Sequence, residues 1–288
     1  MGLNIKNETG KLVTVVLGIA EDMGKPPSIE ECIDPKTKEN LINNTYPKEG
    51  DCINEIENLN KILLRNGVEV LRPNNIQNLN QIFTRDIAFV IEDKLFIPDI
   101  IKERNKEKDG IKYLLDNFEK DEKIIIPEDI SIEGGDIIIH NNYIFIGYSN
   151  DDKLKVSRTS SKSIPFIQKH FPDKKVLGFD LVKDDNDPYN NILHLDCVMQ
   201  PVGKDNIIIY EGGFKKKNEL EKLIETFDGE IMVENQWRVG GSNGKHYTVE
   251  WDPYHKSYSC GCKGYKFRRR CRHITQLSET FRRRMHAG

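Results

Sequence analysis

Three stretches of the chain repeat one order of apolar and polar positions. In each, two β-rich apolar runs separated by a short polar turn predict a β-hairpin. Helix-like sequence and then a short apolar strand follow, so the repeating unit is ββαβ. The expected helices cover residues 110–118, 163–171 and 218–227, and the expected closing strands cover residues 123–127, 174–179 and 229–233. A unit repeated at this period is typical of propeller or solenoid folds.

The amino-terminal region supplies part of another unit. It has an apolar strand at 11–18, a helical pattern at 53–64 and a second strand at 68–73. One strand of a hairpin is missing from it. The chain therefore holds about three and a half units before residue 235, and we expect an α/β fold.

Each full unit begins next to an aspartate. Asp86, Asp136 and Asp196 stand 50 and 60 residues apart. A single aspartate at such a position usually stabilises the turn before a strand. Three in equivalent places, beside Glu133 and His194, favour a shared pocket, because equivalent ends of a radial repeat converge. A pocket lined by carboxylates suits a planar cation such as a guanidinium.

The three motifs, in their order and spacing, resemble the guanidine-modifying superfamily of amidinotransferases, arginine deiminases and dimethylargininases. They are Thr84-Arg85-Asp86, Glu133-Gly134-Gly135-Asp136 and His194-Leu195-Asp196. The likeness covers about residues 11–233. It implies a five-bladed α/β propeller of ββαβ units, which agrees with the repeat, and here the propeller is incomplete.

The resemblance also implies roles for individual residues. Catalysis in the superfamily begins when a cysteine thiolate attacks the guanidinium carbon. Asp86 and Asp196 match the carboxylates that hold the guanidinium. Glu133 matches the carboxylate that polarises it, and His194 matches the general acid and base. Arg158 is similar in placement to an arginine that binds the carboxylate of the substrate.

The nucleophile is the departure from this pattern. In the superfamily it follows one more blade, but no further hairpin follows Val233 here. We expect Cys197, directly after Asp196 on a strand, to point to the opposite face and into the core. Cys32 and Cys52 match no motif. The propeller part is therefore expected to be inactive. The alternative, an active guanidine hydrolase or amidinotransferase, needs a cysteine from an unexpected position or from a partner subunit.

A second chemical signal lies near the carboxyl end of the sequence. Cys260-Gly-Cys262 and Cys271-Arg-His273 are eight residues apart and supply three sulfurs and one imidazole, enough for a tetrahedral zinc shell. Strands are expected at 237–239, 246–251 and 257–260, and a helix at 273–284. This pattern resembles a SWIM-type zinc finger over about residues 237–280.

The finger resemblance predicts two domains, residues 1–235 and 236–288. Four protein ligands leave no open position on the metal, so we expect one structural Zn²⁺ per chain. Two alternatives stay open: cysteines that merely share a loop, and a role for His246 or His255 as ligands.

Charge separates the same two parts. Residues 237–288 hold twelve Lys and Arg against three acidic residues, whereas residues 1–236 carry a net charge of −12. The basic residues include Arg268, Arg269, Arg270, Arg272 and Arg282–Arg284, interleaved with Tyr265, Phe267 and Phe281. Such a surface can neutralise phosphates and stack on bases, which predicts binding of DNA, RNA or an acidic protein. The alternatives are a basic face that only aids solubility, or one that binds the acidic part of the same chain.

No apolar run approaches the length of a membrane span, and the amino-terminal residues do not read as an export signal. We therefore expect a cytoplasmic protein, with a guanidinium-type small molecule as ligand of the first part. An incomplete propeller leaves an open edge, which predicts a homo-oligomer that covers it. A last interpretation is the joining of two unrelated pieces, of which only the zinc module keeps its activity.

Overall fold

The repeat appears in the computed structural model as four consecutive sheets. The structure describes residues 2–151, 153–227, 229–233, 236–241, 244–252 and 257–277. The partial unit comprises β1 (Thr14–Val16), α1 (Pro35–Ile42), α2 (Glu49–Arg65) and β2 (Glu69–Leu71). Its two strands run parallel, so the strand that the sequence lacks is also missing from the fold.

Each of the three full units has the predicted ββαβ order. The first comprises α3 (Thr84–Ile87), β3 (Phe89–Ile91), β4 (Lys94–Ile97), α4 (Glu107–Leu115) and β5 (Lys123–Ile125). The second comprises η1 (Gly134–Asp136), β6 (Ile137–His140), β7 (Tyr143–Tyr148), α5 (Ser163–His170) and β8 (Lys175–Asp180). The third comprises η2 (Leu195–Cys197), β9 (Met199–Val202), β10 (Asn206–Ile209), η3 (Glu211–Gly213), α6 (Lys217–Thr226) and β11 (Glu230–Val233).

The pairing inside the units repeats as well. In each, the two hairpin strands are antiparallel, and the closing strand lies parallel to the second one. A parallel return requires a long crossover, which the helix of the unit supplies. The predicted unit is thus confirmed.

The core is centred on the second unit, where β6 and β7 are buried along their whole length. Strands buried on both faces read as continuous apolar runs, and residues 137–139 are three consecutive isoleucines. One face of this sheet packs toward the first unit and the other toward the third. The units are therefore joined by side-chain packing across their faces.

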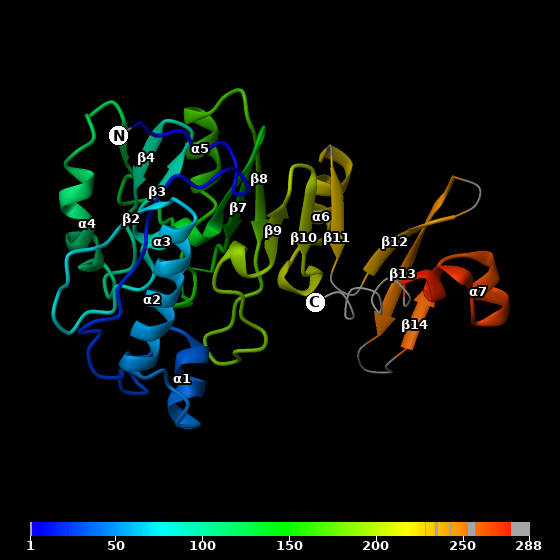
Figure 1. Cartoon of the computed structure of the whole chain (residues 1–288), viewed down its shortest axis with the longest axis horizontal. Coiled ribbons are helices and arrows are strands. Elements are labelled where there is room, and N and C mark those ends of the chain that lie inside the picture. Colours follow the sequence, from blue (N-terminus) through cyan, green and yellow to red (C-terminus); the bar gives the residue numbers. More distant parts are fainter. Residues whose placement is uncertain are drawn as a thin grey trace.

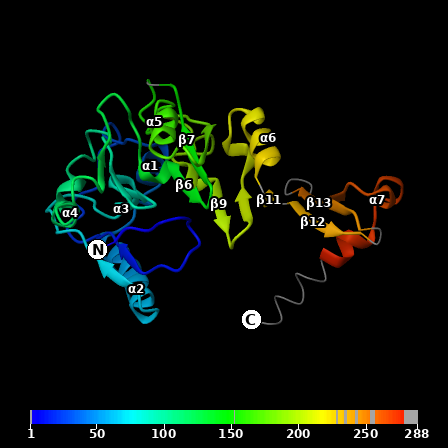
Figure 2. The ribbon, with the colours of Figure 1, turned by 90° about the horizontal axis from the view of Figure 1, so that it is seen from above.

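A different architecture begins after β11. Strands β12 (Gln236–Gly240), β13 (His246–Asp252) and β14 (Ser257–Cys260) form an antiparallel sheet, followed by α7 (Lys263–Arg268) and by helical residues 272–277. Figures 1 and 2 show this carboxyl module beyond the last sheet of the repeat. The three predicted strands are confirmed. Of the predicted helix, residues 278–284 lie outside the described residues.

Three details differ from the sequence prediction. The motif residues lie on short helical turns before the hairpins, not on strand starts. Helix α1 was not predicted, although Asp34 caps it by accepting a hydrogen bond from the Thr37 amide (2.8 Å) and Pro35 opens it. Helix α7 was not among the predicted elements, and its amino-terminal cap is the sulfur of Cys262.

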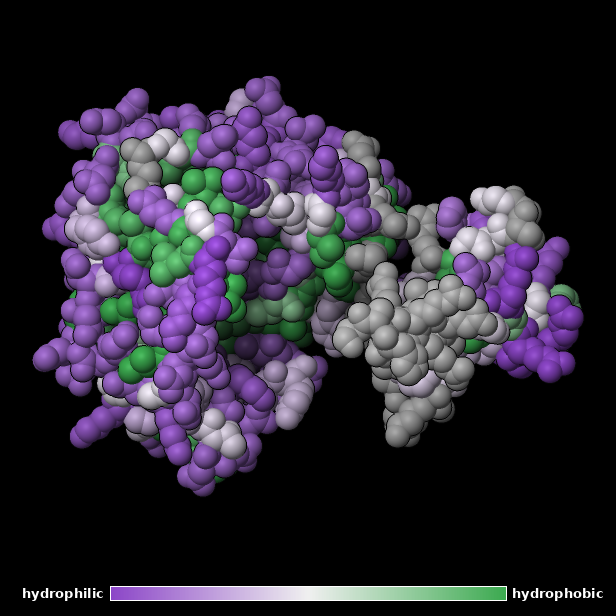
Figure 3. Space-filling model, in the orientation of Figure 1, coloured by the Kyte–Doolittle hydropathy of each residue, from purple (hydrophilic) through white to green (hydrophobic). Residues whose placement is uncertain are grey.

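One face of the third sheet carries exposed apolar side chains. Val202, Ile208 and Tyr210 are 40–47% exposed, and Figure 3 shows apolar side chains at the surface near β9 and β10. No fourth ββαβ unit follows within the described residues. Among those residues, no helix has the combined length and apolar composition needed to cross a membrane.

Candidate functional site: a carboxylate–histidine cluster and a Cys3His cluster

The three motif turns converge as the repeat predicts. Asp86 lies in α3, Glu133 directly precedes η1, and His194 directly precedes η2. One side-chain atom from each lies within 4.8 Å of the others. All three side chains are buried. We call Asp86, Glu133 and His194 the carboxylate–histidine cluster.

Two of the three repeated aspartates fasten one unit to the next. The Gly135 amide donates to Oδ1 of Asp86 (3.2 Å), and the Leu195 amide donates to Oδ1 of Asp136 (2.9 Å). Gly135 and Leu195 hold the same position, one residue before the aspartate of their own motif. Asp136 is fully buried, and burial raises the pKa of its carboxyl group. The recurrence of an aspartate at position 136 is therefore explained by a structural role, because its side chain joins two successive units.

Asp196 is the third aspartate of the repeat, and within the described residues no further ββαβ unit follows it to which its side chain could bond. Its Oδ2 lies 3.5 Å from Arg85 Nε, and its Oδ1 lies 3.7 Å from the sulfur of Cys197. Asp196 is outside the compact group formed by the other two carboxylates and His194. Its role in holding a guanidinium stays a prediction.

Glu133 and His194 form a tightly paired acid and base. His194 Nε2 lies 2.9 Å from Glu133 Oε2. Burial alone would raise the pKa of Glu133, but the hydrogen bond from His194 and the charges of Arg158, His194 and Arg104 lower it to about 2. Burial alone would lower the pKa of His194, but its bond to Glu133 and the nearby carboxylates raise it. A charged carboxylate beside a protonated imidazole can hold a cation and deliver a proton.

Arg158 is buried against the cluster and is occupied within the protein. Its Nη1 donates to Glu133 Oε1 (3.2 Å), and its Nε and Nη2 donate to the backbone carbonyls of Lys155 (3.1 Å) and Ile33 (3.2 Å). The guanidinium thus holds Glu133 in place in this structure. The expected contact with a substrate carboxylate stays a prediction.

Arg104 belongs to the site although the sequence analysis did not select it. Its Nη1 donates to Asp86 Oδ2 (2.8 Å) and lies 3.4 Å from Glu133 Oε2. Its Nε and Nη2 donate to the two oxygens of Glu107, each at 2.8 Å. Arg104 stands among alternating Lys and Glu residues, a pattern typical of a solvated surface. The sequence therefore carried no signal that it points inward.

Within the described residues, no cysteine sulfur forms a hydrogen bond with the side chains of the carboxylate–histidine cluster. Cys32 donates to the Ser28 carbonyl (3.3 Å). Cys197 is exposed, so the expected core position was wrong. It lies on the turn η2, where the side-chain alternation of a strand does not apply. Partial burial of its sulfur and the neighbouring Asp196 raise the pKa of this thiol, which opposes nucleophilic activation.

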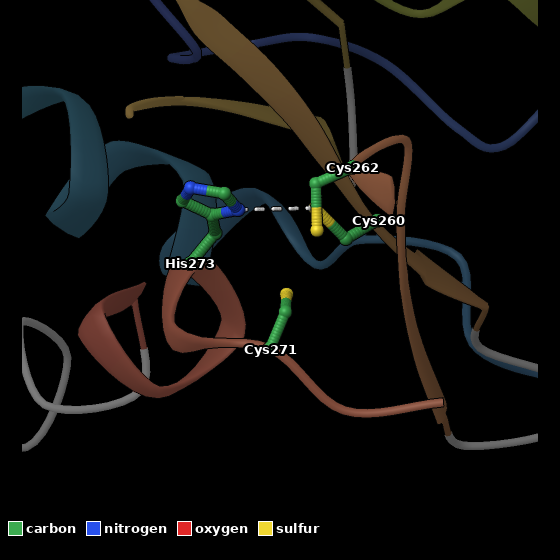
Figure 4. A group of neighbouring side chains, drawn as sticks. All are labelled: Cys260, Cys262, Cys271 and His273. Carbon is green, nitrogen blue, oxygen red and sulfur yellow. Dashed lines mark hydrogen bonds between the residues drawn. The ribbon is translucent and has the colours of Figure 1, made fainter. Parts of the chain in front are cut away.

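The Cys3His cluster is assembled as the spacing predicts. Cys260 ends β14, Cys262 caps α7, and Cys271 and His273 stand at the start of the helical residues 272–277. Their ligand atoms lie within 4.8 Å of one another, and Cys260 Sγ is 3.6 Å from His273 Nδ1. Figure 4 shows the four side chains pointing toward a common centre. They could hold a metal ion.

The cluster also forms much of the core of its module. Cys260 and Cys262 are buried with Val239, Val249 and Leu277. Partly buried Trp237, Tyr247, Tyr258, Tyr265 and Ile274 pack against this small core, in which the two cysteines are among the buried residues. His246 is exposed and lies outside the group of four, and His255 lies outside the described residues.

The basic surface is next to the Cys3His cluster. The exposed residues of the first run are Arg268, Arg269, Arg270 and Arg272. Phe267 beside them is 85% exposed, and the Arg269 guanidinium lies 6.0 Å from the Tyr265 ring centre. The second run, Arg282–Arg284 with Phe281, lies outside the described residues.

Comparison with protein families matches residues 32–234 to the family described as N,N dimethylarginine dimethylhydrolase, eukaryotic. This chain belongs to that family. The dimethylarginine dimethylhydrolase region contains the whole carboxylate–histidine cluster and ends where the carboxyl module begins. The Cys3His cluster lies outside it.

Individual relatives agree with this placement. An uncharacterised protein of Bacillus subtilis, YkgA, is 27% identical over 185 residues, which are 60% of this chain and 58% of that protein. The amidinotransferase SxtG of Microseira wollei superposes with a TM-score of 0.59 at 18% identity, covering 80% of this chain and 75% of SxtG. The dimethylarginine dimethylhydrolase of Pseudomonas aeruginosa, solved with citrulline, gives 0.54 at 15% identity, covering 78% and 76%. These structures share the α/β fold.

Proposed function

We propose that this chain is a zinc-stabilised interaction protein whose first part is a dimethylarginine dimethylhydrolase-type domain that binds a guanidinium group without turning it over. The Cys3His cluster is the single observation that carries the proposal, because its four ligand atoms converge from separate elements. We further propose that the module is a SWIM-type finger and that its basic face binds nucleic acid.

The donor set of the cluster fits zinc. Bonds of about 2.3 Å to sulfur and about 2.0 Å to nitrogen at a tetrahedral angle separate the two ligand atoms by about 3.5 Å. The Cys260 Sγ to His273 Nδ1 distance is 3.6 Å. The Tyr265 amide also donates to the sulfur of Cys262 (3.3 Å), a bond that stabilises a thiolate. A bound zinc would be structural and would link β14 to the two helical segments.

The basic face supports a polyanionic partner. Four exposed arginines follow the exposed Phe267 closely in the chain, a combination that suits a phosphate backbone with an unstacked base. We expect a labelled single-stranded oligonucleotide to bind the full chain with an affinity that falls steeply as salt rises. The partner could instead be an acidic protein segment. An acidic peptide with the same charge as the oligonucleotide, used in the same assay, distinguishes the two.

Matched variants sharpen that experiment. Replacing Arg268, Arg269, Arg270 and Arg272 by alanine should weaken oligonucleotide binding at least about tenfold. Replacing the exposed Lys61 and Arg65 of α2 by alanine removes positive charge from the first part and should change little. Equal losses in the two variants would contradict a site on the module.

The first part has groups suited to holding and protonating a guanidine, but among its described residues no cysteine sulfur is hydrogen-bonded to the side chains of the cluster. Without a thiolate that reaches the guanidinium carbon, no covalent adduct can form. We expect no release of dimethylamine or citrulline from N,N-dimethylarginine. Turnover that disappears in Cys197→Ala would instead support the alternative, an active cysteine-dependent hydrolase.

A further inference from the structure

The guanidinium of Arg104 lies where the carboxylate–histidine cluster would receive a planar cation. Its Nη1 faces Asp86 Oδ2 at 2.8 Å and Glu133 Oε2 at 3.4 Å. Glu107 holds the opposite edge through two hydrogen bonds of 2.8 Å. The side chain is only 11% exposed. Three carboxylates thus surround this one guanidinium.

Among the charged side chains that contact Glu133 or Arg104, the charges balance with Arg104 in place. Asp86, Glu107 and Glu133 supply three negative charges. Arg104, Arg158 and a protonated His194 supply three positive charges. A second guanidinium would bring an uncompensated buried charge, which costs several kcal/mol as a rule. An external cation therefore fits this site only in exchange for Arg104.

The segment that carries Arg104 is suited to such an exchange. Residues 98–106 connect β4 to α4, and the neighbours of Arg104 on both sides are exposed. Its backbone bonds are local: the Arg104 amide donates to the Ile101 carbonyl (3.0 Å), and the Glu107 amide donates to the Arg104 carbonyl (2.9 Å). Asp99 is tied to Ser131 by an isolated β-bridge and Ile100 is buried, so only residues 101–106 can withdraw without disturbing strand pairing or core packing. We call residues 101–106 the arginine turn.

We propose that Arg104 is an internal guanidinium ligand that closes the carboxylate–histidine cluster, and that an external guanidinium binds only when the arginine turn withdraws. The proposal concerns binding alone. It rests on the guanidinium-binding part of the proposed function and is independent of the zinc module and of turnover.

Calorimetric titration of the full chain with methylguanidinium tests the exchange, because this probe has no carboxylate for an arginine to bind. Arg104→Met keeps the apolar stem and removes the competing cation, so we expect binding at least about tenfold tighter than in the wild type. Methylammonium is a cation without the planar guanidinium group, so the same substitution should increase its affinity much less.

Arg158→Met is the matched control, since Arg158 contacts the same Glu133 and is also buried. It is enclosed at 1% exposure, so its removal should not tighten binding of the probe. An equal gain in both variants, or no gain in Arg104→Met, would overturn the proposal, since neither would single out Arg104 as the competing ligand.

A measurement on the wild type keeps the test independent of the variants. At saturating methylguanidinium, hydrogen exchange of the arginine turn should become faster, because the ligand displaces its anchor. Ligands ordinarily protect the segments they contact. Unchanged or slower exchange over residues 101–106 would contradict the displacement of Arg104.

Discussion

Gly135 shows why the second motif needs a residue without a side chain. A Cβ atom there would lie 2.8 Å from the His194 ring and 2.9 Å from Asp86 Oδ1. Neither neighbour can withdraw freely, because His194 is bonded to Glu133, and Asp86 to Arg104. The side chains of the cluster therefore pack this closely only because residue 135 has no Cβ atom.

Gly135→Ala should lower the free energy of unfolding by about 1–3 kcal/mol, the usual cost of overpacking a filled site. Chemical denaturation measures it. Gly50→Ala is the matched control, because a Cβ there meets nothing within 4 Å and α2 gains a better helix former. A Gly135→Ala protein as stable as the control would contradict the tight contact.

The pairing of His194 with Glu133 also makes stability depend on pH. The pKa of His194 is raised from its ordinary 6.5, so its contribution is complete below that pH and is lost as pH rises through the higher folded value. The pKa of Glu133 falls from 4.5 to about 2, so its contribution is present above pH 4.5 and is lost on acidification toward pH 2.

His194→Gln tests the alkaline side. It should flatten the fall in unfolding free energy above pH 6.5, because the variant has no imidazolium to lose. The groups around the ring, Asp86, Asp136, Glu133, Arg104 and Arg158, are retained in both proteins. Denaturation midpoints that depend on pH identically in both proteins would show that His194 does not carry this dependence.

Among the elements, we expect the carboxyl module to depend most on its Cys3His cluster. The three strands offer only a small apolar core, in which two of the buried residues are cysteines. Structural zinc in small domains contributes on the order of 10 kcal/mol to folding. We therefore expect the module to unfold on chelation while the repeat stays folded.

Tryptophan fluorescence reports unfolding of the module and not of the repeat, because both tryptophans of the chain, Trp237 and Trp251, lie in β12 and β13. Cys271→Ser should give the emission of exposed tryptophan without altering the far-ultraviolet signal of the repeat. Cys52→Ser in α2 is the control and should leave the emission unchanged. Native emission in Cys271→Ser would contradict the dependence on the cluster.

The elements that sequence reasoning recovered are those with a strong pattern. Apolar runs and polar turns located every hairpin and closing strand of the three units, and equivalent motif positions located Asp86, Glu133 and His194. Helix α1 had a usable signal in Asp34 and Pro35. Helix α7 did not, because a cysteine sulfur caps it in place of the usual oxygen.

Other features of the site depend on three-dimensional contacts that no local pattern encodes. Arg104 points inward from a charged surface turn, and Cys197 is exposed because η2 departs from strand geometry. The spacing of the aspartates suggested a ligand pocket, whereas the structure uses Asp86 and Asp136 to fasten successive units. Asp86 does both, since its second oxygen faces Arg104.

At the level of the whole molecule, the last sheet of the repeat has an exposed apolar face. Ile208 and Tyr210 on the third unit are 43% and 47% exposed. Exposed apolar side chains on a sheet face favour association with a second copy. Ile208→Glu should shift sedimentation toward the monomer, whereas Ile224→Glu on the exposed side of α6 should not. Identical, concentration-independent monomers in all three proteins would contradict this expectation.

We infer that the carboxyl module holds a zinc ion and is attached to a dimethylarginine dimethylhydrolase-type domain. Elemental analysis of metal-replete full chain tests it most directly. We predict about one zinc per chain, as four protein ligands require, and loss of that zinc in Cys260→Ser but not in Cys32→Ser. A zinc content well below one per chain in the wild type, or zinc retained in Cys260→Ser, would contradict the account.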